Sequence, residues 1–199
     1  MIRTPQALIP YIIALGCAAA GGLWHQAGQV PSLGHVVTRG VAQVGGPFSL
    51  IDQNGNRRTD ADFRGRWMLV YFGYTNCPDV CPTTLALMTE ALKRLGGTAG
   101  EIAPIFITLD PAHDTPKILR LYLASFDPRF IGLTGGNSDI AKVAKEYHVY
   151  SAKRPLSGGG YAIDHSGVIC LMGPDGKFDA VYDDSQPPDA IAADLRKRI

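Results

Sequence analysis

A buried strand that runs directly into two closely spaced cysteines constrains this chain more than any other feature. Residues 67–72 are apolar and aromatic, as in a strand that is covered on both faces, and Gly73 ends the run. Cys77 and Cys81 follow, and Pro82 stands in the first turn of a helical pattern. Both thiols are therefore expected on a strand-to-helix turn. There the helix N-terminus lowers a thiol pKa and favours the thiolate.

The cysteine spacing leaves several roles open. Residues four apart at a helix start lie on one face, so the sulfurs of Cys77 and Cys81 can converge on each other or on one ion. A thiolate is both the nucleophile of redox exchange and a metal ligand. A purely structural disulfide is a third interpretation, but so small a loop gives little entropic stabilisation.

The first thirty residues differ from the rest of the chain. Arg3 precedes an apolar run, residues 7–24, that contains no charged residue. A run of this length spans a bilayer or forms the core of a signal peptide. We interpret residues 1–25 as an N-terminal transmembrane anchor (or a signal segment, if the chain is cleaved there) and residues 26–45 as a linker. In each case residues 46–199 form a domain outside the cytosol.

Net charge argues against one large class of partners. The 199 residues carry 19 Lys and Arg against 18 Asp and Glu, a formal net charge of +1. There is no basic run with interleaved aromatic residues either. We therefore expect no nucleic-acid binding.

Strands and helices alternate through the middle of residues 46–199, and a hairpin pattern closes the sequence. The predicted strands are residues 47–52, 67–72, 102–109, 130–134, 161–165, 167–172 and 177–182. The predicted helices are residues 59–63, 81–95, 117–126, 138–148 (capped by Asn137 or Ser138) and 188–199. Residues 153–160 are predicted as a basic, glycine-rich loop. This order indicates an α/β fold in which helices flank a mixed sheet, and a cysteine pair at a strand-to-helix turn makes it thioredoxin-like.

Export bears on the four cysteines, because a free pair outside the cytosol oxidises unless a reductant or a metal holds it. Cys17 lies in the apolar run and is a poor match to a lipidation site. Cys170 lies in another apolar run, where it is expected to be a small buried hydrophobe. Cys77 and Cys81 remain as a pair.

Two thiolates do not complete a zinc site. Two thiolates and one imidazole suit copper, since sulfur selects Cu(I) and an imidazole lets the site also hold Cu(II).

The imidazole has to come from one of five histidines. His165 ranks first, because it lies at a strand edge beside the glycine-rich loop. His113 ranks second, in the loop after a buried strand, and His148 ends a helix of ordinary pattern and is expected to be structural. His25 and His35 lie in the anchor and the linker.

Three motifs in this order resemble the signatures of the Sco (SenC-type) family of copper chaperones for cytochrome c oxidase assembly. They are residues 71–82, with Cys-Pro-Asp-Val-Cys-Pro; residues 110–116, Asp-Pro-Ala-His-Asp-Thr-Pro; and residues 164–166, Asp-His-Ser. The resemblance covers roughly residues 45–182. One departure is His113, since the family usually has a basic residue, most often arginine, at that place.

The resemblance implies a thioredoxin-like domain that binds one copper ion, Cu(I) or Cu(II), through Cys77, Cys81 and His165. It also implies a partner, which is subunit II of cytochrome c oxidase or another copper chaperone. The expected location is the inner membrane. There the domain faces the periplasm of a bacterium, which is favoured, or the mitochondrial intermembrane space. A metallochaperone is not expected to be an enzyme, and thiol–disulfide oxidoreductase activity stays open as an alternative.

Two alternatives use the same cysteines differently. A thiol–disulfide oxidoreductase that reduces partner cysteines needs redox-active Cys77 and Cys81 but no histidine. A peroxiredoxin-like peroxidase fits less well, because no threonine stands three residues before a single attacking cysteine followed by a supporting arginine. For the copper carrier, we further expect the 153–160 loop to be mobile, so that His165 can approach and leave the thiolates.

Overall fold

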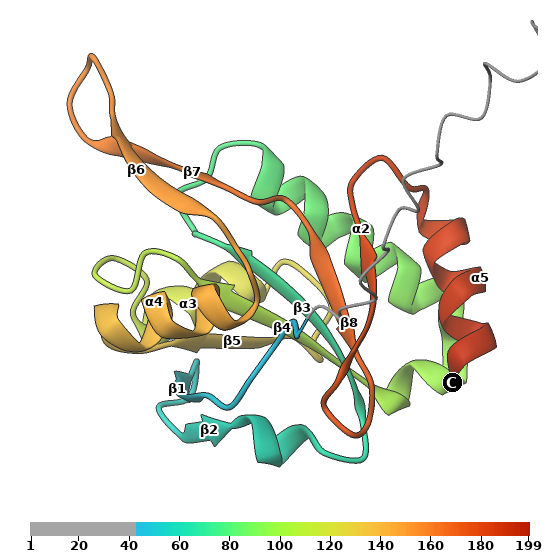
Figure 1. The fold of residues 1–199 in the computed structure, drawn as a ribbon. Helices are drawn as coiled ribbons and strands as arrows, with labels where there is room; N and C mark the ends of the chain where they lie inside the picture. Colours follow the sequence, from blue (N-terminus) through green and yellow to red (C-terminus); the bar gives the residue numbers. More distant parts are fainter. Residues whose placement is uncertain (1–42) are drawn as a thin grey trace, which may run out of the picture. The chain divides into compact units, whose positions relative to one another are not determined.

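A seven-stranded mixed sheet forms the centre of residues 43–199, the part of the chain that the computed structural model describes (Figure 1). The strand order is β2-β1-β5-β4-β3-β8-β9. The strands are β1 (Ser49–Asp52), β2 (Arg57–Thr59), β3 (Trp67–Gly73), β4 (Ile102–Thr108), β5 (Ile131–Thr134), β8 (Ile169–Met172) and β9 (Phe178–Tyr182). The α-helices are α2 (Val80–Leu95), α3 (Pro116–Leu123), α4 (Asn137–Glu146) and α5 (Pro188–Arg198), and short 3₁₀ helices span Asp60–Phe63 and Gly96–Glu101.

The three central strands are parallel, and helices connect them. Strand β3 pairs with β4, and β4 pairs with β5, while β1 and β8 run antiparallel to their neighbours. Every residue of β4 is buried, as is all of β3 after its first residue. Such continuous burial is what the apolar sequences of these strands predict for a sheet covered on both faces.

Contacts of individual side chains assign the helices to the two faces. Tyr71, Phe106 and Gly132 are register partners on one face, where the Phe106 ring packs on Tyr122 of α3. On the other face the ring of Phe72 packs on Tyr147, just after α4. Helices α2 and α3 thus cover one face and α4 the opposite one, and α5 packs beside α2 (Figure 1). The α/β fold with a helix-flanked mixed sheet is confirmed.

The predicted loop at residues 153–160 is wrong in an informative way. Strands β6 (Ser151–Pro155) and β7 (Tyr161–His165) pair as an antiparallel hairpin that projects from the main sheet (Figure 1). Only the tip, residues 156–160, is a turn, and Gly159 and Gly160 have φ of 89° and 78° there. The sequence of strand β6 is Ser-Ala-Lys-Arg-Pro, which lacks the alternation of apolar and polar residues that predicts a strand.

Three other predictions are corrected or lie beyond the described residues. Helix α4 is capped by Gly136 rather than Asn137 or Ser138, and the Asp139 carboxylate accepts the Gly136 N–H at 3.2 Å. Helix α3 ends at Leu123 rather than Phe126. The anchor at residues 1–25 and almost all of the 26–45 linker lie outside the described part. Within residues 43–199, no helix combines the length and the apolar character needed to cross a membrane.

A single buried carboxylate closes the β1–β2 hairpin. Asp52 Oδ1 accepts the backbone N–H groups of Asn54 and Asn56, each at 2.9 Å, and Arg58 Nε donates to Oδ2 at 3.0 Å. Burial raises the pKa of Asp52, but these donors outweigh it and hold the pKa below its usual range. The charged form therefore stabilises the fold above the pKa of the unfolded carboxyl. That stabilisation is lost as pH falls through the lower folded pKa.

We expect Asp52→Asn to lower the free energy of unfolding at pH 7 by about 1–3 kcal/mol, because an amide is a weaker acceptor and cannot pair with Arg58. Urea unfolding followed by circular dichroism measures this, and Asp184→Asn at an exposed position is the matched control. The difference should begin to shrink below about pH 4, where the unfolded carboxyl takes up its proton, and should disappear once pH falls below the lower pKa of the folded carboxyl. A difference that persists unchanged at low pH would contradict this account.

Candidate metal centre

The two cysteines lie where β3 gives way to α2. Cys81 is in the first turn of α2 and fully buried, while Cys77 lies in the preceding turn and is partly exposed. Gly73, the last residue of β3, makes room for this arrangement. A Cβ atom at position 73 would stand 2.8 Å from Cys81 Sγ and 2.9 Å from the Phe106 ring. Only a residue without a side chain lets the buried sulfur pack against the end of the sheet.

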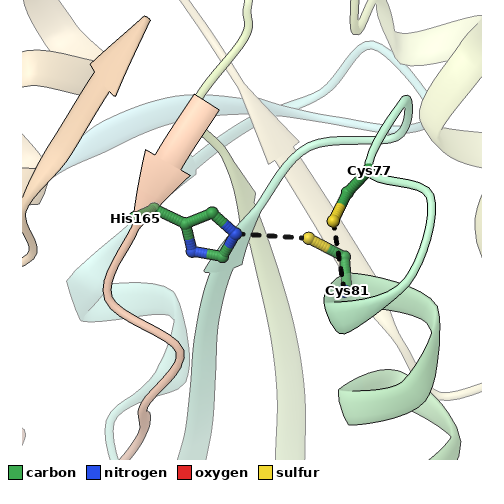
Figure 2. Close-up of side chains that lie close together, drawn as sticks. All are labelled: Cys77, Cys81 and His165. Carbon is green, nitrogen blue, oxygen red and sulfur yellow. Dashed lines mark hydrogen bonds between the residues drawn. The ribbon is translucent and has the colours of Figure 1, made fainter. Parts of the chain in front are cut away.

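His165 reaches the thiols from the hairpin, as its last residue. Its Nε2 lies 3.5 Å from Cys81 Sγ (Figure 2), and its Nδ1 lies 3.0 Å from the carbonyl oxygen of Ser166. A ring whose Nδ1–H donates to a carbonyl has its Nε2 lone pair free, which is the tautomer that metal-ligating histidines adopt. The ring centroids of Tyr71 and Tyr74 lie 6.2 and 6.0 Å from the centroid of the imidazole, and both rings meet it edge-on. These contacts fix the orientation of the imidazole.

The ligand atoms of Cys77, Cys81 and His165 all lie within 4.8 Å of one another. Within residues 43–199 this is the only cluster of three or more potential metal-ligating side chains of this kind. The donor set is two sulfurs and one imidazole nitrogen. It lacks the fourth ligand of a structural zinc site, and its softness fits copper.

The two sulfurs differ in their electrostatic surroundings. Burial raises the pKa of Cys81 to about 12. The expectation that the helix start lowers the thiol pKa is therefore wrong for Cys81, because desolvation outweighs the helix dipole. The helix N-terminus instead serves Cys77, whose sulfur accepts the Cys81 N–H at 3.4 Å. Cys81 thus remains a thiol next to Nε2, and a metal bound there replaces its proton.

The phenol group of Tyr71 lies close to Cys81. The Tyr71 hydroxyl is buried and has no hydrogen-bond partner among the described residues. Burial, together with the nearby Cys81, raises the pKa of Tyr71 well above its usual range, so the hydroxyl keeps its proton. A thiolate at Cys81 would be a stronger acceptor for this donor than the protonated thiol is.

His113, the second-ranked histidine, is not part of the cluster. Its Nδ1 lies 2.9 Å from Asp114 Oδ1, and its Nε2 lies 3.3 Å from the Asn76 side-chain nitrogen. It therefore supports the turn before Cys77. The sequence interpretation did not single out Asp114, and an acid shortly after a buried strand was the one available signal.

The remaining candidates lie where a structural role suggests. His148 follows α4 in a left-handed conformation (φ 54°), with Nε2 3.0 Å from the Gln43 carbonyl oxygen. Cys170 is buried within β8. His25, His35 and Cys17 lie outside the described residues.

An open groove of about 350 Å³ leads to the cluster. Its walls are the 77–80 turn on one side and, on the other, Arg154 and residues 162–165 of the hairpin. Cys77 and His165 line this groove, whereas Cys81 lies beneath it. Two of the three candidate ligands are thus accessible from the groove, and the third is not.

The family model described as SCO1/SenC matches residues 36–199. This chain belongs to the SCO1/SenC family. Protein sco1 of Schizosaccharomyces pombe is 44% identical over 151 residues, which are 74% of this chain and 57% of that protein. Human "Protein SCO1 homolog, mitochondrial" is 38% identical over 155 residues, which are 76% of this chain and 52% of that protein. The chain thus spans a little over half the length of these curated relatives.

Solved Sco structures share the fold. The structure of Bradyrhizobium japonicum ScoI with copper bound has a TM-score of 0.74 and 45% identity, covering 78% of this chain and 99% of that one. BsSco, described as a member of the Sco family of cytochrome c oxidase assembly proteins with a disulfide switch, has a TM-score of 0.63 and 28% identity, covering 78% and 93%. The mixed α/β fold of residues 43–199 is therefore that of the thioredoxin-like Sco domain.

We expect alkylation to distinguish the three cysteines of residues 43–199, because attack needs an accessible thiolate. In the reduced native protein iodoacetamide should modify Cys77 first and should spare buried Cys81 and Cys170. Mass spectrometry of the digested protein measures the three rates, and the same reaction in concentrated urea, where all three should react alike, is the control. Native modification of Cys81 at the rate of Cys77 would show that the buried position is wrong.

Proposed function

We propose that this protein carries copper for the assembly of cytochrome c oxidase and holds one copper ion between Cys77, Cys81 and His165. The observation that carries the proposal is the convergence of two sulfurs and one imidazole nitrogen within 4.8 Å, from a turn and a hairpin more than eighty residues apart. Copper-bound structures of related Sco proteins support the choice of metal. The two thiolates suit Cu(I), and His165 lets the same site hold Cu(II).

The unequal exposure of the ligands gives the transfer a direction. Cys77 and His165 face the groove, so an incoming thiolate of the partner can replace either of them first. Cys81 lies beneath the groove and is released last, when its sulfur regains a proton in its apolar surroundings. Stepwise ligand exchange of this kind keeps the ion coordinated throughout.

The partner and the location complete the proposal. We assign delivery to the binuclear copper site of subunit II, or exchange with another copper chaperone. We place residues 1–25 in the inner membrane as an anchor, residues 26–45 as a linker, and residues 46–199 in the periplasm or, in a mitochondrion, in the intermembrane space. The similar proteins include both a bacterial and a mitochondrial Sco protein, so both compartments fit.

A second function is favoured by the pairing of one accessible and one buried thiol. The Cys77 thiolate would attack a partner disulfide and form a mixed disulfide. Cys81 would then lose its proton and attack Cys77 Sγ, leaving the partner as a dithiol and this chain as the Cys77–Cys81 disulfide. A dithiol reductant would return the two electrons. The disulfide switch described for BsSco supports this alternative.

Copper titration tests the first function. We expect the reduced wild type to bind one equivalent, with thiolate-to-Cu(II) charge-transfer absorption. Cys77→Ala should abolish that absorption, and His165→Ala should weaken Cu(II) binding by about tenfold or more. Cys170→Ala and His148→Asn are the matched controls and should bind as the wild type does. A wild type that binds no copper, or a His165→Ala variant with unchanged affinity, would refute the proposal.

A thiol reductase assay on an oxidised dithiol peptide separates the two functions. If disulfide exchange is the main activity, His165→Ala should retain it while Cys77→Ala and Cys81→Ala lose it, because the imidazole takes no part in sulfur exchange. The measurement is the rate of free-thiol release from the peptide. If the wild type released free thiol no faster than the Cys77→Ala variant does, the second function would be excluded.

A further inference from the structure

We propose that the loop 110–114 sets the distance between the thiols and the histidine, with Asp110, Tyr161 and Lys153 as positioning residues for His165. This inference rests on the proposed copper site and concerns how that site is held together. The loop follows β4 and carries two buried acids, Asp110 and Asp114, which are 1% and 0% exposed. One acid contacts the cysteine turn, and the other contacts the hairpin.

The loop holds its two carboxylates in a fixed relation. The backbone N–H groups of His113 and Asp114 both donate to the Asp110 carbonyl, at 3.0 and 2.8 Å. The Thr108 hydroxyl donates to Asp114 Oδ2 at 2.6 Å and accepts the Asp110 N–H at 2.9 Å. Since Thr108 belongs to a central strand, both acids are tied to the rigid sheet.

Asp114 holds the thiol side. Its carboxylate accepts the Thr75 backbone N–H at 3.0 Å and the Thr75 hydroxyl at 2.5 Å. Thr75 stands two residues before Cys77, in the turn that leads from β3 to α2. Charge-assisted hydrogen bonds of this length are among the stronger ones in proteins, so the turn is tightly held.

Asp110 holds the histidine side. Its Oδ2 accepts the Tyr161 hydroxyl at 2.6 Å, and its Oδ1 accepts Lys153 Nζ at 3.0 Å. Lys153 Nζ also lies 4.1 Å from the centre of the Tyr161 ring, so the two hairpin residues support each other. A buried carboxylate needs such partners, and here both come from the hairpin.

Strand β7 connects the contact between Tyr161 and Asp110 to His165. Tyr161, Ile163 and His165 alternate along β7 and therefore share the face that points to the domain, where Ile163 is buried. Lys153 is the register partner of Ile163. On the opposite face Arg154 and Asp164 form an exposed pair. Anchoring Tyr161 thus fixes His165 about 13 Å further along the same strand.

Two variants test the hairpin side without touching a ligand: Tyr161→Phe, which removes one hydroxyl, and Lys153→Met, which removes one charge. Tyr150→Phe and Lys177→Met at exposed positions are the matched controls. The first readout is amide hydrogen–deuterium exchange of the metal-free, reduced protein. We expect residues 161–165 to exchange about tenfold faster in the two variants, with residues 75–81 unchanged, because each loses a bond to a charged group.

The second readout is the imidazole nitrogen signal in the electron paramagnetic resonance spectrum of the Cu(II)-loaded protein. It should weaken in Tyr161→Phe and Lys153→Met and remain in the controls. Thr75→Ala should give the reverse exchange pattern, with faster exchange in residues 75–81 and an unchanged hairpin. That opposite result separates positioning from a general loss of stability.

The inference would be overturned if both variants matched the wild type in two measurements. These are the amide exchange rates of residues 161–165 and the strength of the imidazole nitrogen signal. Faster exchange of the whole domain in these variants would also overturn it. A wild type that binds no copper would refute the proposed function alone, because the exchange experiment uses the metal-free protein and still reports whether Asp110 holds the hairpin.

Discussion

The contact of the Cys81 sulfur with the end of β3 is the constraint on which the site depends. The sulfur fits only because Gly73 has no side chain there, and it is then shut off from solvent. The turn that carries Cys81 supplies one further candidate ligand, Cys77, but no imidazole. Another element has to place an imidazole next to the sulfur. The hairpin that ends at His165 does this. The position of the groove, the proposed order of ligand exchange and the proposed second anchoring point all follow from the burial of one sulfur.

The same arrangement separates metal binding from folding. The core of residues 43–199 is built from strands across the main sheet and from the helices that cover it. Of the three candidate ligands only Cys81 belongs to it, and Cys77 packs against its edge. In a zinc finger, by contrast, the binding free energy is the folding free energy, and removal of the metal unfolds the chain. On the proposed function, an ion at this site can leave while the sheet stays intact. This is what a carrier requires and what a structural metal site avoids.

Sequence reasoning succeeded where a signal is local and strong. The apolar run of β3 and the proline-opened helix α2 placed Cys77 and Cys81 almost to the residue. It failed where the cause is long-range. The hairpin strand β6 has no apolar face, because its order comes from pairing with β7. The pKa of Cys81 was mispredicted because desolvation by the packed sheet is invisible in the sequence of the turn. The histidines could be ranked, but only the resemblance gave His165 a role, and only the structure brought it to the thiols.

The composition of β6 has a further consequence for the solubility of the protein. Within the described residues β6 and β7 pair only with each other, so each presents an open strand edge. Open edges recruit strands of other chains and lead to aggregation. Strand β6 carries Lys153, Arg154 and Pro155 in succession. Both charged side chains are held in ion pairs, with Asp110 and Asp164, which a strand added at this edge would have to accommodate. Pro155 lacks the N–H that strand addition needs. The β6 edge of the hairpin is therefore protected against strand addition without the cover of a helix.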